Sequence, residues 1–262
     1  MQIGLIGKTL EHSFSKKYFE EKFLPAANEL AQRQAGQKES LKNFSYQNFE
    51  LKKISEFKNL LKNNPEIKGL NITYPYKEEI LPFLDAIDEE AKKIGAVNCV
   101  KINNGFTTGY NTDAFGFKQS IKPFLEPKHN KALIFGTGGS SKAIAYSLKQ
   151  INVDFYFVTS SKNKKTENTF FYSELTPYIL SQFLLLINCT PLGMFPKTND
   201  CPNIPYQNIT PNHLAYDLIY NPEETLFLKQ AKQKGALTVN GLSMLQWQAE
   251  RSWEIWNNKG QS

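Results

Sequence analysis

The segment ALIFGTGGSSKAIAYSL, residues 132–148, constrains the fold more than any other part of the chain. An apolar run suited to a buried strand leads into Gly136, Gly138 and Gly139, and an amphipathic helical pattern follows at once. Glycines allow a sharp turn and a close approach to a pyrophosphate, which free N–H groups at the helix start can bind. A tight turn without a ligand is the plainer alternative, but the flanking strand and helix favour a dinucleotide-binding unit.

The same alternation of short apolar runs and amphipathic stretches continues along the chain and predicts an α/β protein with mostly parallel strands. We expect strands at residues 3–6, 43–50, 69–72, 96–102, 131–135, 155–159, 184–188, 214–218 and 237–239. The clearest helix is NPEETLFLKQAKQKG, with Pro222 at its first position and Gly235 as its cap. A last helix is expected over residues 243–258.

Composition excludes several classes of protein. With 262 residues, of which 40% are hydrophobic, the chain can bury a substantial core. The net charge of +6 is spread among interspersed acids, and the cluster SKNKK at 161–165 lacks aromatic neighbours, so we expect no nucleic-acid partner. Cys99, Cys189 and Cys201 form no CxxC pair, and the three histidines are far apart, which argues against a disulfide framework or a metal site.

The apolar runs are also too short for a signal peptide or a membrane span. The N-terminus has only MQIGLIGK, and the longest other run, FLLLIN at 183–188, has the length of a strand. Together with the cysteine pattern, which suits a reducing compartment, this predicts a cytoplasmic protein without membrane contact.

The segment VTSSKNKK, residues 158–165, follows the next expected strand, whose end normally meets an adenosine ribose. An acid there would bind the 2′-hydroxyl of NAD, whereas cations and hydroxyls suit a 2′-phosphate. The segment has no acid and offers Thr159, Ser160, Ser161 and Lys162, which favours NADP. A solvated loop with incidental lysines is the alternative.

Three more segments combine turn residues with polar side chains: GYNTDAFG at 109–116, INCTPLGM at 187–194 and DLIYNP at 217–222. Asp113 fits the N-terminal cap of a helix, which is a purely structural role. Thr190 and Pro191 end the strand expected at residues 184–188, which is likewise a structural role. Taken singly, none of these segments requires a catalytic interpretation.

Taken together and in order, eight segments resemble the shikimate dehydrogenase family over nearly the whole chain. They are HSFSK, NITYPYK, GAVNC, GYNTDAFG, FGTGGSSKA, NCTPLGM, DLIYNP and NGLSMLQWQA. The resemblance implies two α/β domains with a cleft between them. A discontinuous substrate-binding domain is expected at residues 1–105 plus 241–262, and a Rossmann-like NADP-binding domain at 106–240.

The resemblance also implies roles for individual residues. Lys77 matches the catalytic lysine and Asp113 its partner. The positions that match substrate-binding groups are Ser13, Ser15, Asn71, Thr73, Asn98, Tyr220 and Gln248. The positions expected near the cofactor are Gly136, Gly138, Gly139, Ser140, Thr159, Ser160, Ser161, Lys162, Thr190, Leu218 and Gly241.

The implied reaction is the reversible reduction of 3-dehydroshikimate to shikimate with NADPH, in the biosynthesis of aromatic amino acids through chorismate. An ammonium such as Lys77 supplies both a positive field and a proton where negative charge grows on the ketone oxygen. Asp113 would orient that ammonium and bind a substrate hydroxyl. Serine hydroxyls suit the substrate carboxylate because they donate without adding charge. No metal is implied, and either a monomer or a homodimer fits.

Some positions depart from the usual pattern of the family. Lys16 stands where a proline is common and Cys99 where a threonine is common, while residues 159–161 replace an Asn-Arg-Thr triplet that binds the 2′-phosphate. The alternatives are an NAD-dependent quinate/shikimate dehydrogenase, an enzyme acting on an aminated shikimate analogue, and a non-catalytic ligand-binding regulator. An acid at the ribose position would mark the first, and loss of Lys77 or Asp113 would mark the last. Neither change is present.

Overall fold

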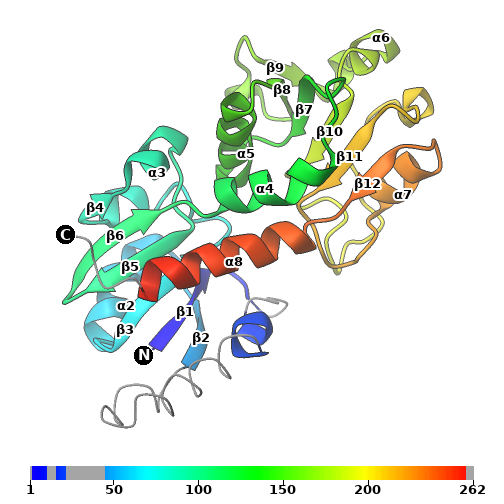
Figure 1. Cartoon of the computed structure of the whole chain (residues 1–262). Helices are drawn as coiled ribbons and strands as arrows, with labels where there is room; N and C mark the ends of the chain where they lie inside the picture. Colours follow the sequence, from blue (N-terminus) through cyan, green and yellow to red (C-terminus); the bar gives the residue numbers. More distant parts are fainter. Residues whose placement is uncertain (1, 11–15, 22–44, 258–262) are drawn as a thin grey trace. The chain divides into compact units, whose positions relative to one another are not determined.

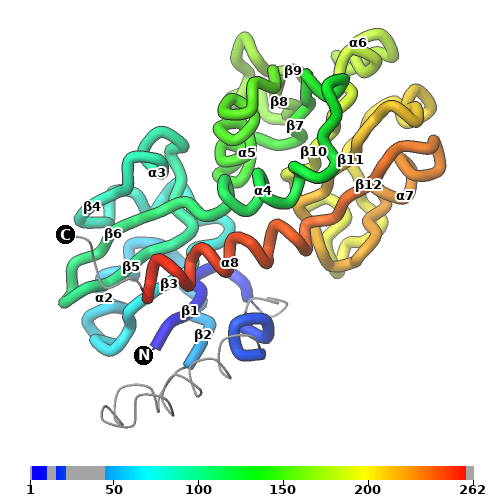
Figure 2. Tube along the Cα trace, in the orientation of Figure 1, coloured from blue at the N-terminus to red at the C-terminus, as the bar shows by residue number. Residues whose placement is uncertain are grey.

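The computed structural model describes residues 2–10, 16–21 and 45–257. Contacts divide the chain into two compact units, one made of residues 1–112 and 249–262 and the other of residues 113–248. The first unit therefore contains both the first strands and the end of the last helix, as the blue and red parts of the trace show (Figure 2). Both boundaries between the units lie later than the sequence predicts, by seven residues at the first and by eight at the second.

The first unit is built on a mixed sheet of six strands in the order β2-β1-β3-β5-β6-β4 (Figure 1). The strands are β1 (Gln2–Gly7), β2 (Ser45–Glu50), β3 (Ile67–Ile72), β4 (Ala86–Ile87), β5 (Cys99–Asn103) and β6 (Phe106–Tyr110). Its helices are η1 (Ile54–Glu56), α2 (Phe57–Asn63), η2 (Leu81–Phe83), α3 (Glu89–Ile94) and the end of α8 (Leu242–Asn257). The strands β2, β1 and β3 are parallel, whereas β5 runs antiparallel to both β3 and β6.

The hairpin of β5 and β6 was not predicted, and it explains why the first boundary lies later than expected. Its turn passes through Asn104 and Gly105, whose φ angles are 49° and 82°. Asn and Gly are the residues that best tolerate positive φ at both central positions of a two-residue hairpin turn. The predicted boundary near Phe106 falls on the first residue of β6, which pairs with β5 and so belongs to the first unit.

The end of α8 packs tightly on the first sheet. A Cβ on Gly69 would lie 2.5 Å from Nε1 of Trp256, so glycine at this position lets the indole ring rest against β3. The Trp256 Nε1 donates to the carbonyl oxygen of Val100 at 3.0 Å. The burial of a large aromatic ring with its one polar group satisfied fixes this helix end to β3 and β5.

The second unit contains a parallel sheet of six strands in the order β12-β11-β10-β7-β8-β9. The strands are β7 (Lys131–Phe135), β8 (Asp154–Thr159), β9 (Thr169–Phe171), β10 (Leu185–Asn188), β11 (Leu214–Asp217) and β12 (Leu237–Val239). Its helices are α4 (Asp113–Ile121), η3 (Lys122–Phe124), α5 (Gly139–Gln150), η4 (Lys162–Lys164), η5 (Tyr172–Glu174), α6 (Pro177–Ser181), η6 (Tyr206–Asn208), α7 (Leu226–Lys232) and the start of α8.

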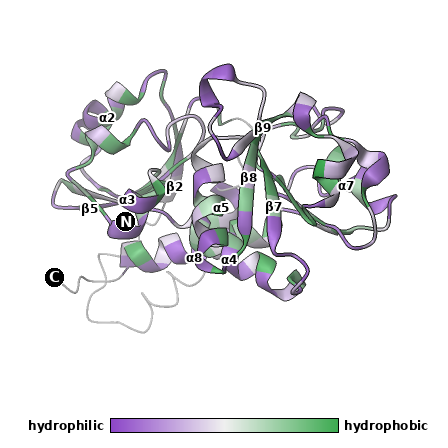
Figure 3. Ribbon diagram, turned by 90° about the horizontal axis from the view of Figure 1, so that it is seen from above, coloured by the Kyte–Doolittle hydropathy of each residue, from purple (hydrophilic) through white to green (hydrophobic). Residues whose placement is uncertain are grey.

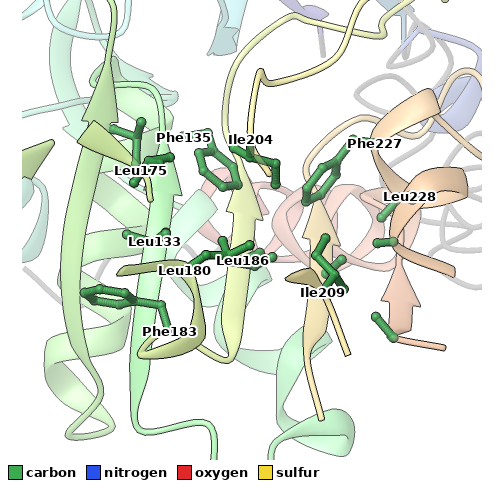
Figure 4. Packing of buried hydrophobic residues seen from close by; sticks show 14 residues of the cluster. Leu133, Phe135, Leu175, Leu180, Phe183, Leu186, Ile204, Ile209, Phe227 and Leu228 are labelled. Atoms are coloured by element: carbon green, nitrogen blue, oxygen red, sulfur yellow. The ribbon is translucent and has the colours of Figure 1, made fainter. Parts of the chain in front are cut away.

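Residues alternate between the two faces of this sheet, and each face has its own core. Leu133 and Phe135 of β7 pack with α6 and α7 (Figure 4), whereas Ala132 and Ile134 pack with α4 and α5. Strands covered on both sides are hydrophobic along most of their length, as Figure 3 shows for β7 and β8. This is a doubly wound α/β unit, in which the carboxyl ends of the strands share one edge.

One helix begins later than predicted. Pro222 does not occupy the first turn of α7, which starts at Leu226. Thr225 is its N-cap, and the threonine hydroxyl accepts from the N–H of Leu228. A hydroxyl that satisfies an open N–H outweighs the preference of proline for the first position. Within the described residues, no helix is both long and apolar enough to cross a membrane, and no group of three potential metal ligands occurs.

Candidate functional site

The glycine turn after β7 lies between the carboxyl ends of two neighbouring strands, β8 and β10. Gly136 has a φ of 102°, and its N–H donates to the carbonyl oxygen of Val158 at 2.8 Å. A Cβ at this position would lie 3.2 Å from Cγ2 of Thr190. Glycine is thus required at position 136 by the backbone itself, whatever the turn binds.

Gly138 has no such structural requirement. Its φ of −88° suits any residue, and a Cβ placed on it would meet nothing within 4 Å. As the N-cap of α5 it provides no side-chain hydrogen bond to the first turn. Open space beside an uncapped helix N-terminus is what a pyrophosphate needs, and Gly139 and Ser140 form the first residues of that helix.

The loop after β8 presents polar groups to solvent. Ser160, Ser161 and Lys162 are exposed, whereas Thr159 is buried and its Oγ1 accepts from the N–H of Ser161 at 3.1 Å. Thr159 therefore shapes the loop instead of facing outward. In the part of the chain that the structure describes, Lys162 makes no ion pair, while Lys165 pairs with Glu174. These residues fit a 2′-phosphate, which needs a cation and hydroxyl donors.

A buried polar network orders the ends of β10 and β11. Asn188 Oδ1 accepts from both the N–H (3.0 Å) and the hydroxyl (2.6 Å) of Thr190, and Asn188 Nδ2 donates to Asp217 Oδ1 at 3.1 Å. The Asp217 carboxylate also accepts from the hydroxyl of Thr225 at 2.6 Å and from the N–H of Ile219 at 3.0 Å. Burial is the main influence on Asp217 and raises its pKa to about 6, against these hydrogen bonds, which lower it.

Two further positions expected near the cofactor follow from this network. The N–H of Leu218 donates to the carbonyl oxygen of Asn188 at 3.0 Å. A Cβ on Gly241 would lie 2.0 Å from the carbonyl oxygen of Leu218, so only glycine fits there. Thr190, Leu218 and Gly241 are therefore held together at the carboxyl edge of the second sheet.

In the first unit, Asn71, Thr73 and Lys77 lie at or just after the end of β3. Asn71 lies within the strand, and the N–H of Thr73 donates to the carbonyl oxygen of Ile6 at 2.9 Å. Lys77 is half-buried in a turn, where its carbonyl oxygen accepts from the N–H of Val97 at 2.8 Å. The turn thus brings the backbone of Lys77 beside the segment that carries Asn98. Ser13 and Ser15 lie outside the described residues.

Asn98 fixes the chain immediately before Asp113. Its Oδ1 accepts from the N–H of Thr112 at 2.6 Å, and its Nδ2 donates to the Thr112 hydroxyl at 2.9 Å. Asp113 is the buried first residue of α4. The carboxylate of Asp113 therefore follows directly on a residue that Asn98 holds in place.

The remaining predicted substrate residues belong to the second unit. Tyr220 follows the Asp217 network, and Gln248 lies in α8, where its Nε2 donates to the carbonyl oxygen of Leu245 at 3.0 Å. A Cβ on Gly116 would lie 3.0 Å from Cβ of Gln248 and 2.7 Å from the carbonyl oxygen of Met244. The glycine in GYNTDAFG thus allows α4 to approach α8 at the position of Gln248.

Known proteins resemble this chain over most of its length. The family described as the shikimate dehydrogenase substrate binding domain matches residues 5–100. A relative from Methanococcus aeolicus named shikimate dehydrogenase (NADP(+)) is 40% identical over 267 residues, which are 97% of this chain and 91% of the relative. The chain belongs to the shikimate dehydrogenase family.

Solved structures of this family share the fold. Shikimate dehydrogenase 1 from Peptoclostridium difficile has a TM-score of 0.80 and 34% identity, and the match covers 100% of this chain and 93% of that one. Quinate dehydrogenase from Corynebacterium glutamicum, solved with NAD, also has a TM-score of 0.80, with 27% identity and coverage of 98% and 93%. The fold alone therefore does not separate shikimate from quinate, or NADP from NAD.

Several residues that support the motifs of the shikimate dehydrogenase family were not predicted from the sequence. They are Tyr46, Thr112, Asn188, Asp217, Thr225 and Ser252. The sequence indicates Asn188 and Asp217, because each is a polar residue at the end of a buried strand. It does not indicate Tyr46 and Ser252, because their partners are far away in the sequence.

Proposed function

We propose that the chain catalyses the reversible NADPH-dependent reduction of 3-dehydroshikimate to shikimate, a step in the biosynthesis of chorismate and the aromatic amino acids. The observation that carries this proposal is the similarity to the Methanococcus aeolicus enzyme over 97% of this chain. The enzyme would be an oxidoreductase acting on a CH–OH group. Shikimate, 3-dehydroshikimate and NADP(H) are then its small-molecule partners.

The residues of the chain fit this chemistry. When bound, NADPH supplies the hydride that adds to the carbonyl carbon. Negative charge then develops on the carbonyl oxygen, where the Lys77 ammonium stabilises it and donates the proton that completes the hydroxyl. Asp113 orients that ammonium and accepts a hydrogen bond from a substrate hydroxyl. In the reverse direction, the same lysine accepts the hydroxyl proton.

The substrate would be held by hydroxyl and amide side chains. Ser13 and Ser15 donate to its carboxylate without adding charge, while Asn71, Asn98 and Gln248 bind its hydroxyls. Thr73 and Tyr220 complete this set. Because the carboxylate and the hydroxyls of the substrate would bind different kinds of side chain, the ring would be held in one orientation.

The loop after β8 supports NADP over NAD. An acid there would repel a 2′-phosphate, and the loop has none, whereas exposed Lys162 and the hydroxyls of Ser160 and Ser161 can bind one. A quinate dehydrogenase that uses NAD is the second candidate, because a quinate dehydrogenase with the same fold was solved with NAD. The absence of the Asn-Arg-Thr triplet from this chain weakens the argument for NADP without reversing it. Because the loop has a cation and hydroxyls but no acid, we favour NADP as the cofactor.

We place the enzyme in the cytoplasm as part of the same proposal. None of its three cysteines forms a disulfide, which suits a reducing compartment. Its assembly would be a monomer or a homodimer.

Replacing Lys77 tests the catalytic assignment. Lys77→Ala removes both the positive charge and the proton donor, so we expect kcat to fall at least about 100-fold while KM for shikimate changes little. Lys93→Ala is the matched control, because Lys93 is an exposed lysine in the last turn of α3. Steady-state kinetics would measure both variants. Near-normal turnover by a folded Lys77→Ala enzyme would contradict the assignment.

A further inference from the structure

A buried polar network in the first unit connects the predicted substrate residues to the end of α8. Its members come from five segments of the chain: Tyr46, Asn71, Asn98, Thr112 and Ser252. Ser252 is fully buried, and Asn71 is 6% exposed. Buried polar groups are costly unless they are hydrogen-bonded, so the geometry of such a network is tightly determined.

The side chain of Asn71 is committed at both ends. Its Oδ1 accepts from the hydroxyl of Tyr46 at 3.1 Å. Its Nδ2 donates to the carbonyl oxygen of Asn98 at 3.3 Å and to Oγ of Ser252 at 3.2 Å. An amide nitrogen has two protons, and both are used. Asn71 can therefore offer a ligand only the second lone pair of Oδ1.

Ser252 connects Asn71 to Thr112. Its Oγ lies 3.2 Å from Asn71 Nδ2 and 3.1 Å from Oγ1 of Thr112. A reversed Asn71 amide would place its oxygen against the carbonyl oxygen of Asn98, which can only accept and so excludes that orientation. In the observed orientation, Ser252 Oγ accepts the second amide proton. Without the serine hydroxyl, one proton of the amide would be left buried and unsatisfied.

We propose that Ser252 is a positioning residue that holds the Asn71 amide with only its oxygen available, so that the substrate hydroxyl meeting Asn71 must donate. This inference rests on the proposed function, because it takes Asn71 to be a substrate contact. It adds a direction to that contact. A group that can only accept, such as fluorine, is rejected at this position, whereas a hydroxyl or an amino group is tolerated.

The test uses shikimate analogues in which each ring hydroxyl in turn is replaced by fluorine or by an amino group. Each analogue is measured as a competitive inhibitor of shikimate oxidation by the wild-type enzyme and by Ser252→Ala. For one hydroxyl position, the wild-type enzyme should bind the amino analogue at least about tenfold more tightly than the fluoro analogue. In Ser252→Ala, where one amide proton has lost its acceptor and can turn towards a ligand, that ratio should fall several-fold towards one. KM for NADP should not change.

Ser147→Ala is the matched control. Ser147 is also a buried helical serine, but its hydroxyl donates to the carbonyl oxygens of Ala114 and Ala143 in the second unit. This variant loses buried hydrogen bonds without affecting Asn71, so its analogue ratio should equal the wild-type ratio. Should Ser252→Ala fail to fold, Ser252→Cys fills the same space with a weaker acceptor and is expected to lower the ratio in the same direction.

The outcomes separate the two proposals. An unchanged analogue ratio in a folded Ser252 variant would overturn the positioning role, even if the wild-type enzyme oxidises shikimate normally. A lowered ratio in both Ser252→Ala and Ser147→Ala would also overturn it, since the effect would then be a general loss of packing. A wild-type protein that neither oxidises nor binds shikimate would overturn the proposed function instead.

Discussion

Single residues carry the strongest evidence for a bound dinucleotide, and Gly138 is the most informative of them. A side chain there has room in the protein itself, yet the position has none. We expect Gly138→Ala to change the free energy of unfolding by less than about 1 kcal/mol, because the backbone angles suit alanine and only a weak cap preference is lost. KM for NADP should rise about tenfold or more, because the added methyl group occupies space meant for the pyrophosphate.

Gly136→Ala provides the contrast. Gly136 has a φ of 102°, which strains any residue with a Cβ, so this variant should lose stability whether or not a cofactor binds. Thermal unfolding and steady-state kinetics of both variants would separate the two roles. If Gly138→Ala binds NADP as tightly as the wild-type protein, the pyrophosphate does not lie against this glycine.

The residues that the sequence could reveal are those whose role is local. Gly136 and Gly138 lie in a short strand–turn–helix pattern, and Lys77 belongs to a motif that can be identified within seven residues. Ser252 differs, because its contact with Asn71 spans 181 positions and no pattern near Ser252 indicates it. Long-range hydrogen bonds depend on how the elements pack, and a single sequence does not display that packing.

At the scale of elements, the Asp217 carboxylate joins β10, β11 and the cap of α7. Burial raises its pKa from 3.8 to about 6, so the folded protein holds this proton more tightly than the unfolded chain. The contribution of Asp217 to stability is therefore complete below pH 4 and is lost as the pH rises through about 6. A shift of this size corresponds to roughly 3 kcal/mol.

Denaturant unfolding between pH 4 and pH 7 measures this effect. The free energy of unfolding of the wild-type protein should fall with rising pH relative to that of Asp217→Asn, which cannot ionise. Asp154→Asn serves as the control, because Asp154 is exposed at the start of β8. Parallel pH profiles for the wild type and Asp217→Asn would show that burial does not raise the pKa of Asp217.

Elements with a strong periodic pattern were predicted well, and the misses have physical causes. The strands β7 (Lys131–Phe135) and β12 (Leu237–Val239) have the predicted bounds. The hairpin turn at Asn104 and Gly105 was overlooked, although Asn-Gly is a strong hairpin signal. The start of α7 was misplaced because Thr225, which caps the helix and also binds Asp217, competes with Pro222.

At the scale of the whole molecule, the two units carry different sets of predicted functional residues. The first carries Lys77, Asn71 and Asn98, and the second carries the glycine turn and the loop around Lys162. The chain passes from the first to the second at Thr112 and Asp113, and it returns within α8. The doubly wound fold of the second unit could be predicted from its alternating pattern, whereas the mixed sheet of the first could not.

The most direct test of this account is the steady-state oxidation of shikimate and quinate by the full chain, with NADP and NAD assayed in parallel. We expect shikimate with NADP to give the highest kcat/KM, because the loop after β8 has cations and hydroxyls but no acid. A preference for NAD by more than about tenfold, or for quinate over shikimate, would contradict the account.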